Sequence, residues 1–241
     1  MKNENIIEID GKKYKQTFTA LEPEIPAKPE KPKKIELERF VFEDVELKVR
    51  KVNPPKGLIV HFHAGHRDGR NNSLNCLRSG ARNGYKYICL EEDGVLHFPK
   101  NDKTKSGRPS FYGHGWHCGT RHNDDHVGVE VICSGKLGFT QGIFRTWFKK
   151  IIPGKDVRKV KAKDNVKAGY YHTYTDEQEK ALVDLCLYLD ANYESFSLDN
   201  VLGHDEVAPS RKNDPGGSLS MTMPEFRDFL KAKKRERAEN E

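Results

Sequence analysis

The sequence predicts an α/β fold in which a central mixed, largely parallel β-sheet is flanked by helices, with a β-hairpin extension at the N-terminus. Short apolar runs typical of strands alternate with helix signals along the chain. Two of these runs, Gly57–His63 and Val127–Ile132, are apolar over most of their length, as expected of strands in a largely buried sheet. Residues Ile6–Thr19 alternate around an Asp10–Gly11 turn, which predicts the hairpin.

Two capping boxes mark the starts of helices, because in each one a threonine and a glutamine or glutamate can cap each other's backbone. Thr175–Gln178 begins an amphipathic helix that runs to about Tyr193. Thr222–Glu225 begins a helix rich in lysine and arginine that runs to the end of the chain. A further helix is expected at Asn72–Asn83, ended by Gly84.

Further strands are expected on both sides of the first apolar run. Tyr85–Leu90 and Val95–Phe98 have strand character and are joined by a tight turn at Glu91–Gly94. Within Ile35–Val52, apolar residues alternate with charged ones, as on a half-buried strand. The alternating apolar positions are Val45, Leu47 and Val49.

Two segments are expected to lack regular structure. Pro99–Asp125 is a loop-rich stretch, and Phe139–Ala168 is a basic, irregular insertion with eight lysines and arginines between Lys149 and Lys167. The formal net charge of +6 favours anionic partners, such as a bacterial wall polymer or nucleic acid. No RNA-binding or DNA-reading motif accompanies the basic segments, so no nucleic-acid partner is expected.

The 241 residues are expected to divide into five parts. Prolines at positions 23, 26, 29 and 32 recur with a period of three, which is typical of one face of a polyproline II helix and predicts a semi-rigid linker. The parts are a hairpin extension at 1–20, the linker at 21–34, a β segment at 35–55, the main domain at 56–222 and a basic C-terminal helix at 223–241.

The five cysteines are an odd number without a Cys-x-x-Cys pair, which argues against a disulfide scaffold and predicts reduced, mostly buried thiols. No apolar run reaches membrane-spanning length. The N-terminus lacks the hydrophobic core of a secretory signal. The protein is therefore expected to be synthesised in the cytoplasm without a signal peptide, and to reach a substrate outside the membrane by release or delivery.

The stretch Val201–Gly216 concentrates groups with metal and acid–base chemistry. His204 and Asp214 offer an imidazole and a carboxylate, both of which bind zinc. Lys212 is two residues from Asp214, so in an extended segment its ammonium projects to the same side. A catalytic zinc commonly has three protein ligands. His61 is the best candidate for the third, because it ends an apolar run at an expected strand end.

A second ligand set remains open. His63 shares a strand face with His61. With His66 and Asp68, these histidines form a string that is similar to the His-x-His-x-Asp-His string of metallo-β-lactamase-like hydrolases. The match is poor, because Gly65 stands where that string requires aspartate.

Four residues are candidates for catalysis or substrate binding. Glu130 interrupts a valine-rich strand, where it is either a buried carboxylate able to serve as a general base or a solvent-facing residue on an edge strand. Tyr85 ordinarily packs in a core, but its hydroxyl can reach a site at the strand end. Trp116 and His117 lie in a long loop of the kind that lines clefts.

Taken together, these residues resemble the zinc-dependent N-acetylmuramoyl-L-alanine amidases, which include phage endolysins, wall-recycling amidases and peptidoglycan recognition proteins. The resemblance covers roughly residues 56 to 220, and the order and spacing of its motifs agree with the family. The motifs are Leu58–His61, Gly84–Ile88 with Asp93–Gly94, Val127–Glu130 and Gly203–Gly216. The last of these is highly specific to the family, whereas each of the others alone is weak evidence.

The resemblance implies a zinc amidase domain at 56–222, with zinc held by His61, His204 and Asp214. It implies that Lys212 steadies the tetrahedral intermediate. Which residue acts on the attacking water is open, because recycling-type amidases use a carboxylate that matches Glu130. Phage-type amidases use a tyrosine that matches Tyr85.

For the adjoining loop, the resemblance implies that His117 faces substrate, as a loop histidine does in phage-type members. Trp116 is assigned to substrate binding with it. The expected reaction is zinc-dependent hydrolysis of the amide between N-acetylmuramic acid and L-alanine in bacterial peptidoglycan, by a phage lysin. The alternatives are a non-catalytic peptidoglycan-binding module and a cytosolic muropeptide-recycling amidase. The N-terminal extension is expected to dock or target the enzyme, with a partner that the sequence does not name.

Overall fold

The computed structural model describes residues 4–9, 12–17, 36–65, 71–119 and 121–240. The chain divides into two compact units, Met1–Lys33 and Lys34–Glu241. In the first unit, β1 (Glu4–Ile9) pairs antiparallel with β2 (Lys12–Thr17), which confirms the predicted hairpin. The Asp10–Gly11 turn and the proline-rich linker at 21–34 lie outside the described residues.

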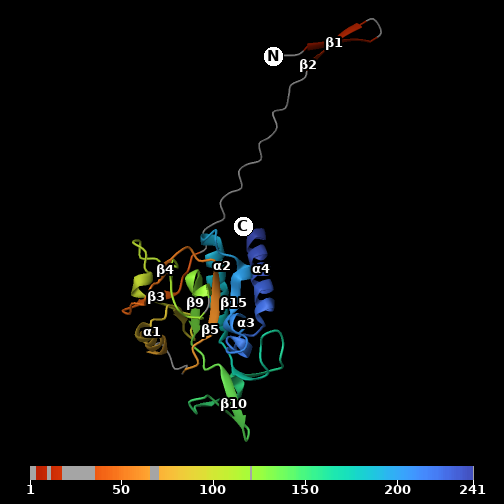
Figure 1. Cartoon of the computed structure of the whole chain (residues 1–241). Coiled ribbons are helices and arrows are strands. Elements are labelled where there is room, and N and C mark those ends of the chain that lie inside the picture. The colour runs from red at the N-terminus through yellow and green to blue at the C-terminus, as the bar shows by residue number, and fades with distance from the viewer. Residues whose placement is uncertain (1–3, 10–11, 18–35, 66–70, 120, 241) are drawn as a thin grey trace. The chain divides into compact units, whose positions relative to one another are not determined.

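A six-stranded mixed sheet forms the centre of the second unit (Figure 1). Neighbouring strands pair in parallel except where β6 meets β7 across the predicted turn at 91–94. The predicted fold class is therefore confirmed. In the order in which they lie side by side, the strands are β15 (Val201–Gly203), β5 (Gly57–Phe62), β9 (His126–Val131), β6 (Ile88–Leu90), β7 (Leu96–Pro99) and β3 (Phe40–Glu43).

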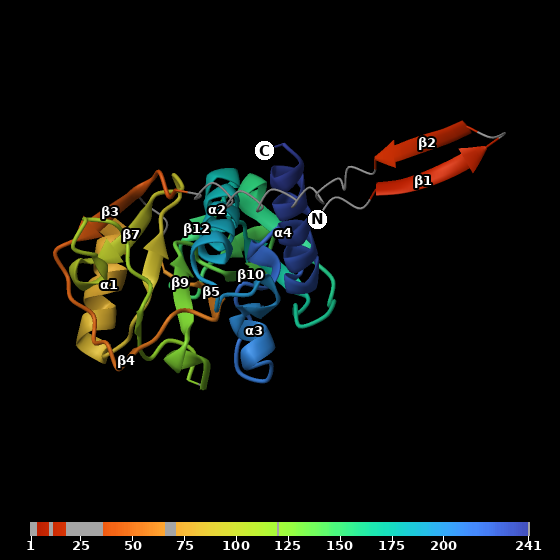
Figure 2. The same cartoon turned by 90° about the horizontal axis from the view of Figure 1, so that it is seen from above.

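Helices cover both faces of this sheet, as Figure 2 shows. On one face, α2 (Asp176–Asn192) and α4 (Met223–Glu239) pack on the strands through buried side chains such as Leu185 and Phe226. On the other face, α1 (Asn71–Asn83) packs through Leu77. Burial on both faces explains why the central strands are apolar almost throughout. In the described part of the chain, no helix combines the length and apolar character that crossing a membrane requires.

The three predicted helices are confirmed, and their starts and ends follow from capping residues. The Thr175 hydroxyl accepts from the backbone N–H of Gln178, and the Gln178 side chain accepts from the backbone N–H of Thr175, both at 3.0 Å. The backbone N–H of Thr222 donates to the carboxylate of Glu225 at 2.8 Å. Gly84 follows α1 with a φ of +72°, a conformation that glycine adopts without steric cost.

The stretch between β3 and β4 (Lys51–Val52) alternates in burial without forming a strand. Val45 and Leu47 are buried, and Asp44, Glu46 and Lys48 beside them are exposed, as predicted, but β3 ends at Glu43. The Leu47 N–H donates to Asn101 Oδ1 at 3.1 Å, and its carbonyl accepts from Asn101 Nδ2 at 2.8 Å. An amide side chain thus satisfies the backbone groups that a neighbouring strand would otherwise pair.

The strand predicted at Tyr85–Leu90 begins only at Ile88. The backbone N–H of Tyr85 donates to Gly80 at the end of α1, at 2.9 Å. The backbone N–H of Lys86 donates to Trp116 at 2.8 Å. The first residues of the predicted strand therefore pair with a helix end and a loop, and they bring Tyr85 beside Trp116.

The prediction of an irregular insertion at 139–168 is wrong, because much of this segment belongs to a second, five-stranded sheet. Phe139, Phe144 and Tyr170 stack on one another with ring centroids 4.8 to 5.1 Å apart. Tyr171 is fully buried. These aromatic contacts hold the strands together, although the many lysines in the segment give it a polar sequence. The strands, in order across the sheet, are β12 (Ile151–Ile152), β11 (Ile143–Arg145), β10 (Lys136–Thr140), β14 (Gly169–His172) and β13 (Val157–Val160).

The stretch Pro99–Asp125 is mostly loop, as predicted, and one short strand in it anchors the segment before the main sheet. β8 (Gly113–His114) pairs antiparallel with β4. The backbone N–H of Arg50 also donates to the carbonyl of His114, at 2.8 Å. Residues 48–52 are therefore held beside the loop that carries Trp116 and His117.

Candidate metal centre and active site

Two adjacent parallel strands bring the predicted histidines together. His61 lies near the end of β5, and His204 begins the short helix α3 (His204–Val207) directly after β15. Because β15 and β5 pair in parallel, with Gly203 opposite Val60, their carboxyl ends meet at one edge of the sheet. The junction requires a glycine, since a Cβ on Gly203 would lie 2.2 Å from the carboxylate of Asp205.

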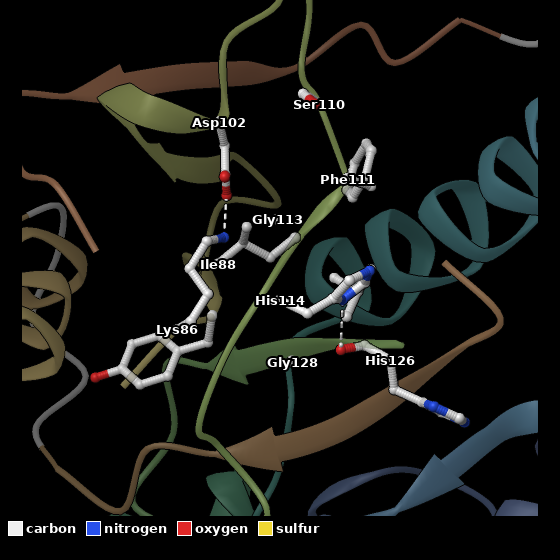
Figure 3. A pocket seen from close by; sticks show the side chains of 11 residues that line it. Lys86, Ile88, Asp102, Ser110, Phe111, Gly113, His114, His126 and Gly128 are labelled. Atoms are coloured by element: carbon white, nitrogen blue, oxygen red, sulfur yellow. Dashed lines mark hydrogen bonds and ion pairs between the residues drawn. The ribbon is translucent and has the colours of Figure 1, made fainter. Parts of the chain in front are cut away.

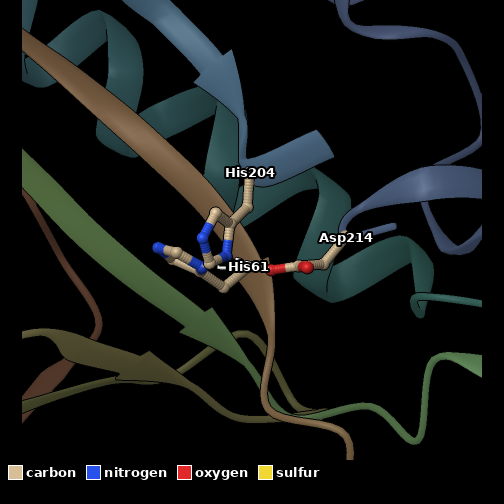
Figure 4. A group of neighbouring side chains, drawn as sticks. All are labelled: His61, His204 and Asp214. Atoms are coloured by element: carbon tan, nitrogen blue, oxygen red, sulfur yellow. Dashed lines mark hydrogen bonds and ion pairs between the residues drawn. The ribbon is translucent and has the colours of Figure 1, made fainter. Parts of the chain in front are cut away.

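Asp214 completes a buried cluster with the two histidines (Figure 4). Its backbone carbonyl accepts from the N–H of Asp205 at 2.7 Å, which folds the segment after α3 back toward the sheet. His61 Nδ1 lies 2.8 Å from His204 Nδ1 and 3.0 Å from Asp214 Oδ2. His204 Nδ1 lies 2.9 Å from the same oxygen. The three residues are 2%, 2% and 5% exposed.

This donor set fits zinc. Two imidazole nitrogens and one carboxylate oxygen are ligand types of catalytic zinc sites, which leave a further position open. The ligands of a tetrahedral zinc lie ~3.3 Å apart. The triangle formed by His61, His204 and Asp214 has edges of 2.8 to 3.0 Å, so a small expansion accommodates the ion.

Electrostatics keep the cluster in the protonation state that a metal requires. Burial lowers the pKa of His61 to about 4, and the adjacent Asp214 carboxylate opposes this shift. Burial alone would raise the pKa of Asp214, but the adjacent imidazoles of His204 and His61 outweigh it and hold that pKa well below its usual range. Near neutral pH, His61 is therefore a neutral imidazole beside a carboxylate anion.

A chain of hydrogen bonds fixes the tautomer of His61. The carbonyl of His126 can only accept, so His117 Nε2, 3.2 Å away, donates to it. Burial lowers the pKa of His117 well below its usual range, so its Nδ1 is an unprotonated acceptor. His61 Nε2 lies 3.1 Å from that atom and donates to it, which leaves the lone pair of His61 Nδ1 directed at the cluster. The buried Tyr174 hydroxyl also donates to the carbonyl of His61 at 3.0 Å.

Glu130 lies directly beside His61. The two residues are partners in the register of β5 and β9, and β9 is an interior strand between β5 and β6. The edge-strand interpretation of Glu130 is therefore wrong. Burial raises the pKa of Glu130 to about 8; the negative charge of Asp214 adds to this rise and Lys212 opposes it. Such a carboxyl group exchanges protons near neutral pH.

The remaining predicted residues surround the same hollow, which has a volume of about 320 Å³. Tyr85 and Trp116 stand at its mouth, 47% and 41% exposed. His117 reaches it from the loop and also contacts His61. Asp214 contacts both histidines but is not among the residues that line the hollow. The residues that line the hollow are His61, Tyr85, Tyr87, Trp116, His117, Cys118, Gly119, Glu130, His204, Arg211 and Lys212.

His63, from the alternative ligand set, is not part of this cluster. His63 Nδ1 accepts a hydrogen bond from the backbone N–H of Cys133 at 3.3 Å. Of the two groups of described residues that could hold a metal ion, one contains His61 and neither contains His63. His66 and Asp68 lie outside the described residues.

Sequence reasoning missed Arg211 and Tyr174. Arg211 lies within the Gly203–Gly216 motif, and its guanidinium donates to the carbonyl of Cys118 at 3.3 Å. Its position within that motif is the sequence feature that could have indicated a role in the site. Tyr174 precedes a capping box and has no local pattern that points to His61, which is 113 residues away in sequence. Only the folded structure brings these two together.

A separate cavity is lined in part by the buried ion pair between Lys86 and Asp102 (Figure 3). His114 Nδ1 approaches the carbonyl of His126 at its other side, at 3.3 Å. The cavity has a volume of about 10 Å³, room for a single water molecule. It is therefore a packing feature and not a substrate site.

A second group, His122, Asp125 and His126, also has metal-ligand chemistry. Its carboxylate is already engaged, because Asp125 lies 2.7 Å from His126 Nδ1 and 3.2 Å from the ammonium of Lys56. An ammonium so close to the carboxylate opposes a second cation there. In the His61 cluster the Asp214 carboxylate instead contacts two imidazoles, so this cluster is the better metal site.

Residues 51–217 match the family model described as N-acetylmuramoyl-L-alanine amidase. The chain belongs to this family. The matched segment contains the buried cluster together with Glu130 and Lys212. No curated protein sequence matches the chain.

Solved structures that are similar to this family member include amidases and a recognition protein. The N-acetylmuramoyl-L-alanine amidase LysC from Clostridium intestinale is 14% identical with a TM-score of 0.48, over 82% of this chain and 97% of that one. AmiD from E. coli is 19% identical with a TM-score of 0.40. The match covers 69% of this chain but only 55% of AmiD. The Drosophila peptidoglycan recognition protein PGRP-SA is 12% identical with a TM-score of 0.43, over 76% and 88%.

Proposed function

We propose that this protein is a zinc-dependent hydrolase of the amide between N-acetylmuramic acid and L-alanine in peptidoglycan. The observation that carries the proposal is the buried triangle of His61, His204 and Asp214, with edges of 2.8 to 3.0 Å, beside Glu130 in one hollow. Membership of the amidase family supports this choice of bond. A module that only bound peptidoglycan would have no need of a proton-exchanging carboxyl group beside a metal site.

The three side chains of the cluster would hold the zinc ion. When bound, zinc polarises the scissile carbonyl and lowers the pKa of a water molecule. His117 and Tyr174 hold His61 in place through its ring and its backbone carbonyl. The side chains therefore offer a preformed ligand set, which reduces the reorganisation that binding requires.

Glu130 acts as the general base in this proposal. It lies beside His61 in the register and removes a proton from the attacking water, then returns it to the leaving amine. Burial raises its pKa to about 8, and additional positive charge at the cluster would bring this pKa down toward neutrality. Tyr85 is 47% exposed at the mouth of the hollow, where its hydroxyl orients the same water or the substrate.

Lys212 stabilises the developing oxyanion. Its ammonium shares the hollow with Glu130 and the two histidines. The backbone N–H of Lys212 donates to the carbonyl of Ala208 at 2.8 Å, which fixes the turn that presents the side chain. A preorganised cation of this kind is worth about 3 kcal/mol of transition-state stabilisation. Trp116 and His117 complete the wall against which substrate lies.

Chemical identification of the cleaved bond tests this proposal. Purified sacculi are incubated with the full chain, with and without a chelator, and the products are identified by mass spectrometry. Release of stem peptides with a free L-alanine amine, abolished by the chelator and restored by zinc, is the expected result. Cleavage of another bond, or activity that ignores the chelator, would overturn it.

We propose further that the chain acts on the intact wall, as a phage lysin does. The hollow is rimmed by exposed aromatic side chains rather than enclosed, which suits a polymeric substrate. Comparison of rates on sacculi and on soluble muropeptides separates this role from wall recycling. A lysin cleaves sacculi at least as efficiently, per bond, as it cleaves the fragments.

A further inference from the structure

The five-stranded sheet and its connections carry more positive charge than the chain as a whole. Residues 136–169 contain ten lysines and arginines but only two aspartates, a formal net charge of +8, whereas the whole chain carries +6. The remaining residues are therefore net −2. No aspartate or glutamate occurs between Lys136 and Lys155, so the charge on β10, β11 and β12 is of one sign. Such a surface attracts an anionic partner.

The hairpin of β11 and β12 ends in a hydrogen-bonded tip, residues 145–151, on a sheet that projects from the main sheet in Figure 1. The backbone N–H of Thr146 donates to the carbonyl of Lys150, and the N–H of Lys149 donates to the carbonyl of Thr146, both at 2.9 Å. The Thr146 hydroxyl accepts from the N–H of Lys150, also at 2.9 Å. The tip therefore presents its side chains on a fixed backbone.

Two large apolar side chains of this tip face solvent. Trp147 is 76% exposed, the largest fraction among the exposed hydrophobic side chains of the described residues, and Ile151 is 54% exposed. The indole N–H of Trp147 donates to the carbonyl of Ala64 at 2.6 Å, so its one polar group is satisfied within the protein. Phe148 packs edge-on against the indole, with ring centroids 5.3 Å apart. The tip therefore exposes apolar surface, which marks an interaction site.

Cations are interleaved with these apolar groups. Arg145 lies directly opposite Ile151 in the strand register, so the two side chains share one face of the hairpin. Lys149 and Lys150 follow the aromatic pair in the turn, and all three cations are exposed. None of the tip residues is among those that line the hollow beside the metal cluster. The tip is therefore a surface of its own, apart from the catalytic hollow.

The combination of charge and apolar surface selects between two kinds of anionic partner. A soluble polyanion would neutralise the cations but would leave Ile151 and the indole of Trp147 in water. A bilayer that contains anionic phospholipid offers phosphates at its surface and an apolar layer beneath them. Tryptophan is enriched at this boundary, and lysine and arginine keep their charged groups at the headgroups. Both properties of the tip thus fit a membrane surface.

We propose that residues 145–151 dock the protein on a membrane surface that contains anionic phospholipid. Trp147 and Ile151 enter the boundary between headgroups and acyl chains, while the exposed cations of the tip bind the phosphates. Because the chain outside residues 136–169 is net negative, the same surface repels it and orients the second sheet toward the bilayer. The bond from Trp147 to Ala64 joins the tip to the segment that follows β5, so docking holds the catalytic unit at the membrane. This binding role is separate from amide hydrolysis.

Co-sedimentation of the full chain with lipid vesicles tests the role of charge. At low salt, the chain is expected to bind vesicles of phosphatidylcholine and phosphatidylglycerol in equal parts, and not vesicles of phosphatidylcholine alone. The variant Lys149→Gln, Lys150→Gln lowers the affinity by about tenfold or more. The control Lys105→Gln, Arg235→Gln removes the same charge at exposed positions outside the second sheet and keeps the wild-type affinity. Absence of binding to the mixed vesicles, or equal loss in both variants, overturns the inference.

Tryptophan fluorescence tests insertion, because the chain has only two tryptophans. Trp116→Phe leaves Trp147 as the sole reporter, and its emission is expected to shift to shorter wavelength on the mixed vesicles and to be quenched by brominated acyl chains. Trp147→Phe leaves Trp116, whose emission stays unchanged. Inorganic polyphosphate offers charge without an apolar layer and does not shift the Trp147 emission. Vesicle binding without a shift of the Trp147 emission, or an equal shift with polyphosphate, would identify a site for soluble polyanions and overturn the inference.

Discussion

Single side chains decide whether His61 can act as a metal ligand. An imidazole has one lone pair when neutral, and it must face the ion. The bonds from His61 to His117 and from His117 to the carbonyl of His126 place that lone pair on Nδ1. Among the described residues, His204 Nε2 has no hydrogen-bond partner, so the control is exerted on His61.

Removal of the acceptor on His117 is therefore expected to weaken zinc binding. His117→Leu leaves His61 Nε2 without an acceptor and lowers zinc affinity by about 10- to 100-fold. His117→Gln retains a carbonyl oxygen that can accept the same hydrogen bond, and serves as the matched variant. Competition with a chelating dye measures both. Equal affinities in the wild type and His117→Leu would show that the contact does not support the metal.

Substitutions of Glu130 and Tyr85 are expected to lower kcat by different amounts, because only Glu130 is assigned the proton transfer. Glu130→Gln keeps the shape of the side chain but not the base, and is expected to lower kcat by about 10² to 10⁴. Tyr85→Phe, at the exposed mouth of the hollow, is expected to lower kcat by less than about tenfold. Zinc content is measured in parallel and remains that of the wild type. A larger loss in Tyr85→Phe than in Glu130→Gln reverses the assignment.

At the scale of elements, the site is built where parallel strands end. His61, Glu130 and His204 come from three consecutive strands of the sheet, and parallel pairing sends all three to one edge. The helix α1, which packs on the sheet face opposite α2 and α4, also contacts the sheet through a buried hydrogen bond. In it, the Ser73 hydroxyl donates to the Glu91 carboxylate. The pH dependence of stability tests this contact between α1 and the sheet.

Glu91 is expected to make stability depend on pH. Burial raises its pKa from 4.5 to about 7, a hydrogen bond from Ser73 opposes the rise, and Asp93 and Glu92 add to it. Between these two values the folded state binds more protons at Glu91 than the unfolded state, so the contribution of this group to stability is highest below pH 4.5 and falls as pH rises toward 7.

Glu91→Gln removes this dependence. Chemical denaturation at a series of pH values is expected to show that the wild type loses about 2 kcal/mol relative to the variant across that window. Glu194→Gln, at an exposed carboxylate, is the control and follows the wild type. Parallel curves for wild type and Glu91→Gln would contradict the prediction.

At the scale of the whole molecule, the fold and most of the site could be predicted, because they rest on local signals. The capping boxes at Thr175 and Thr222, and the apolar runs that contain His61 and Glu130, are contiguous in sequence. The prediction for 139–168 is wrong because contacts among Phe139, Phe144 and Tyr170 hold its strands together, whereas the many lysines of the segment suggest a loop.

Other features depend on distant partners and leave no local trace. Asn101 replaces a strand neighbour for Leu47, 54 residues away. The contact between His61 and His117 spans 56 residues. Residues 48–51 and Arg121 line the same hollow, although about 70 residues separate them in the chain. Sequence patterns report which face of an element is buried, but they do not report which loops the fold places side by side.

The division into two units predicts that the second one is stable by itself. A chain of residues 34–241 retains every described contact of that unit. Its Tm is expected to lie within about 2 °C of that of the full chain, measured by differential scanning calorimetry. A fall of more than about 5 °C would show that residues 1–33 contribute to the stability of the amidase domain.

The central claim is that one zinc ion, held by His61, His204 and Asp214, is required for amide hydrolysis. Titration of the metal-free chain with zinc, with bound metal and the rate of L-alanine amine release followed in the same samples, tests it most directly. Both signals are predicted to rise together and to saturate at about one equivalent. Hydrolysis before zinc is added, or zinc binding that leaves the rate unchanged, would contradict the claim.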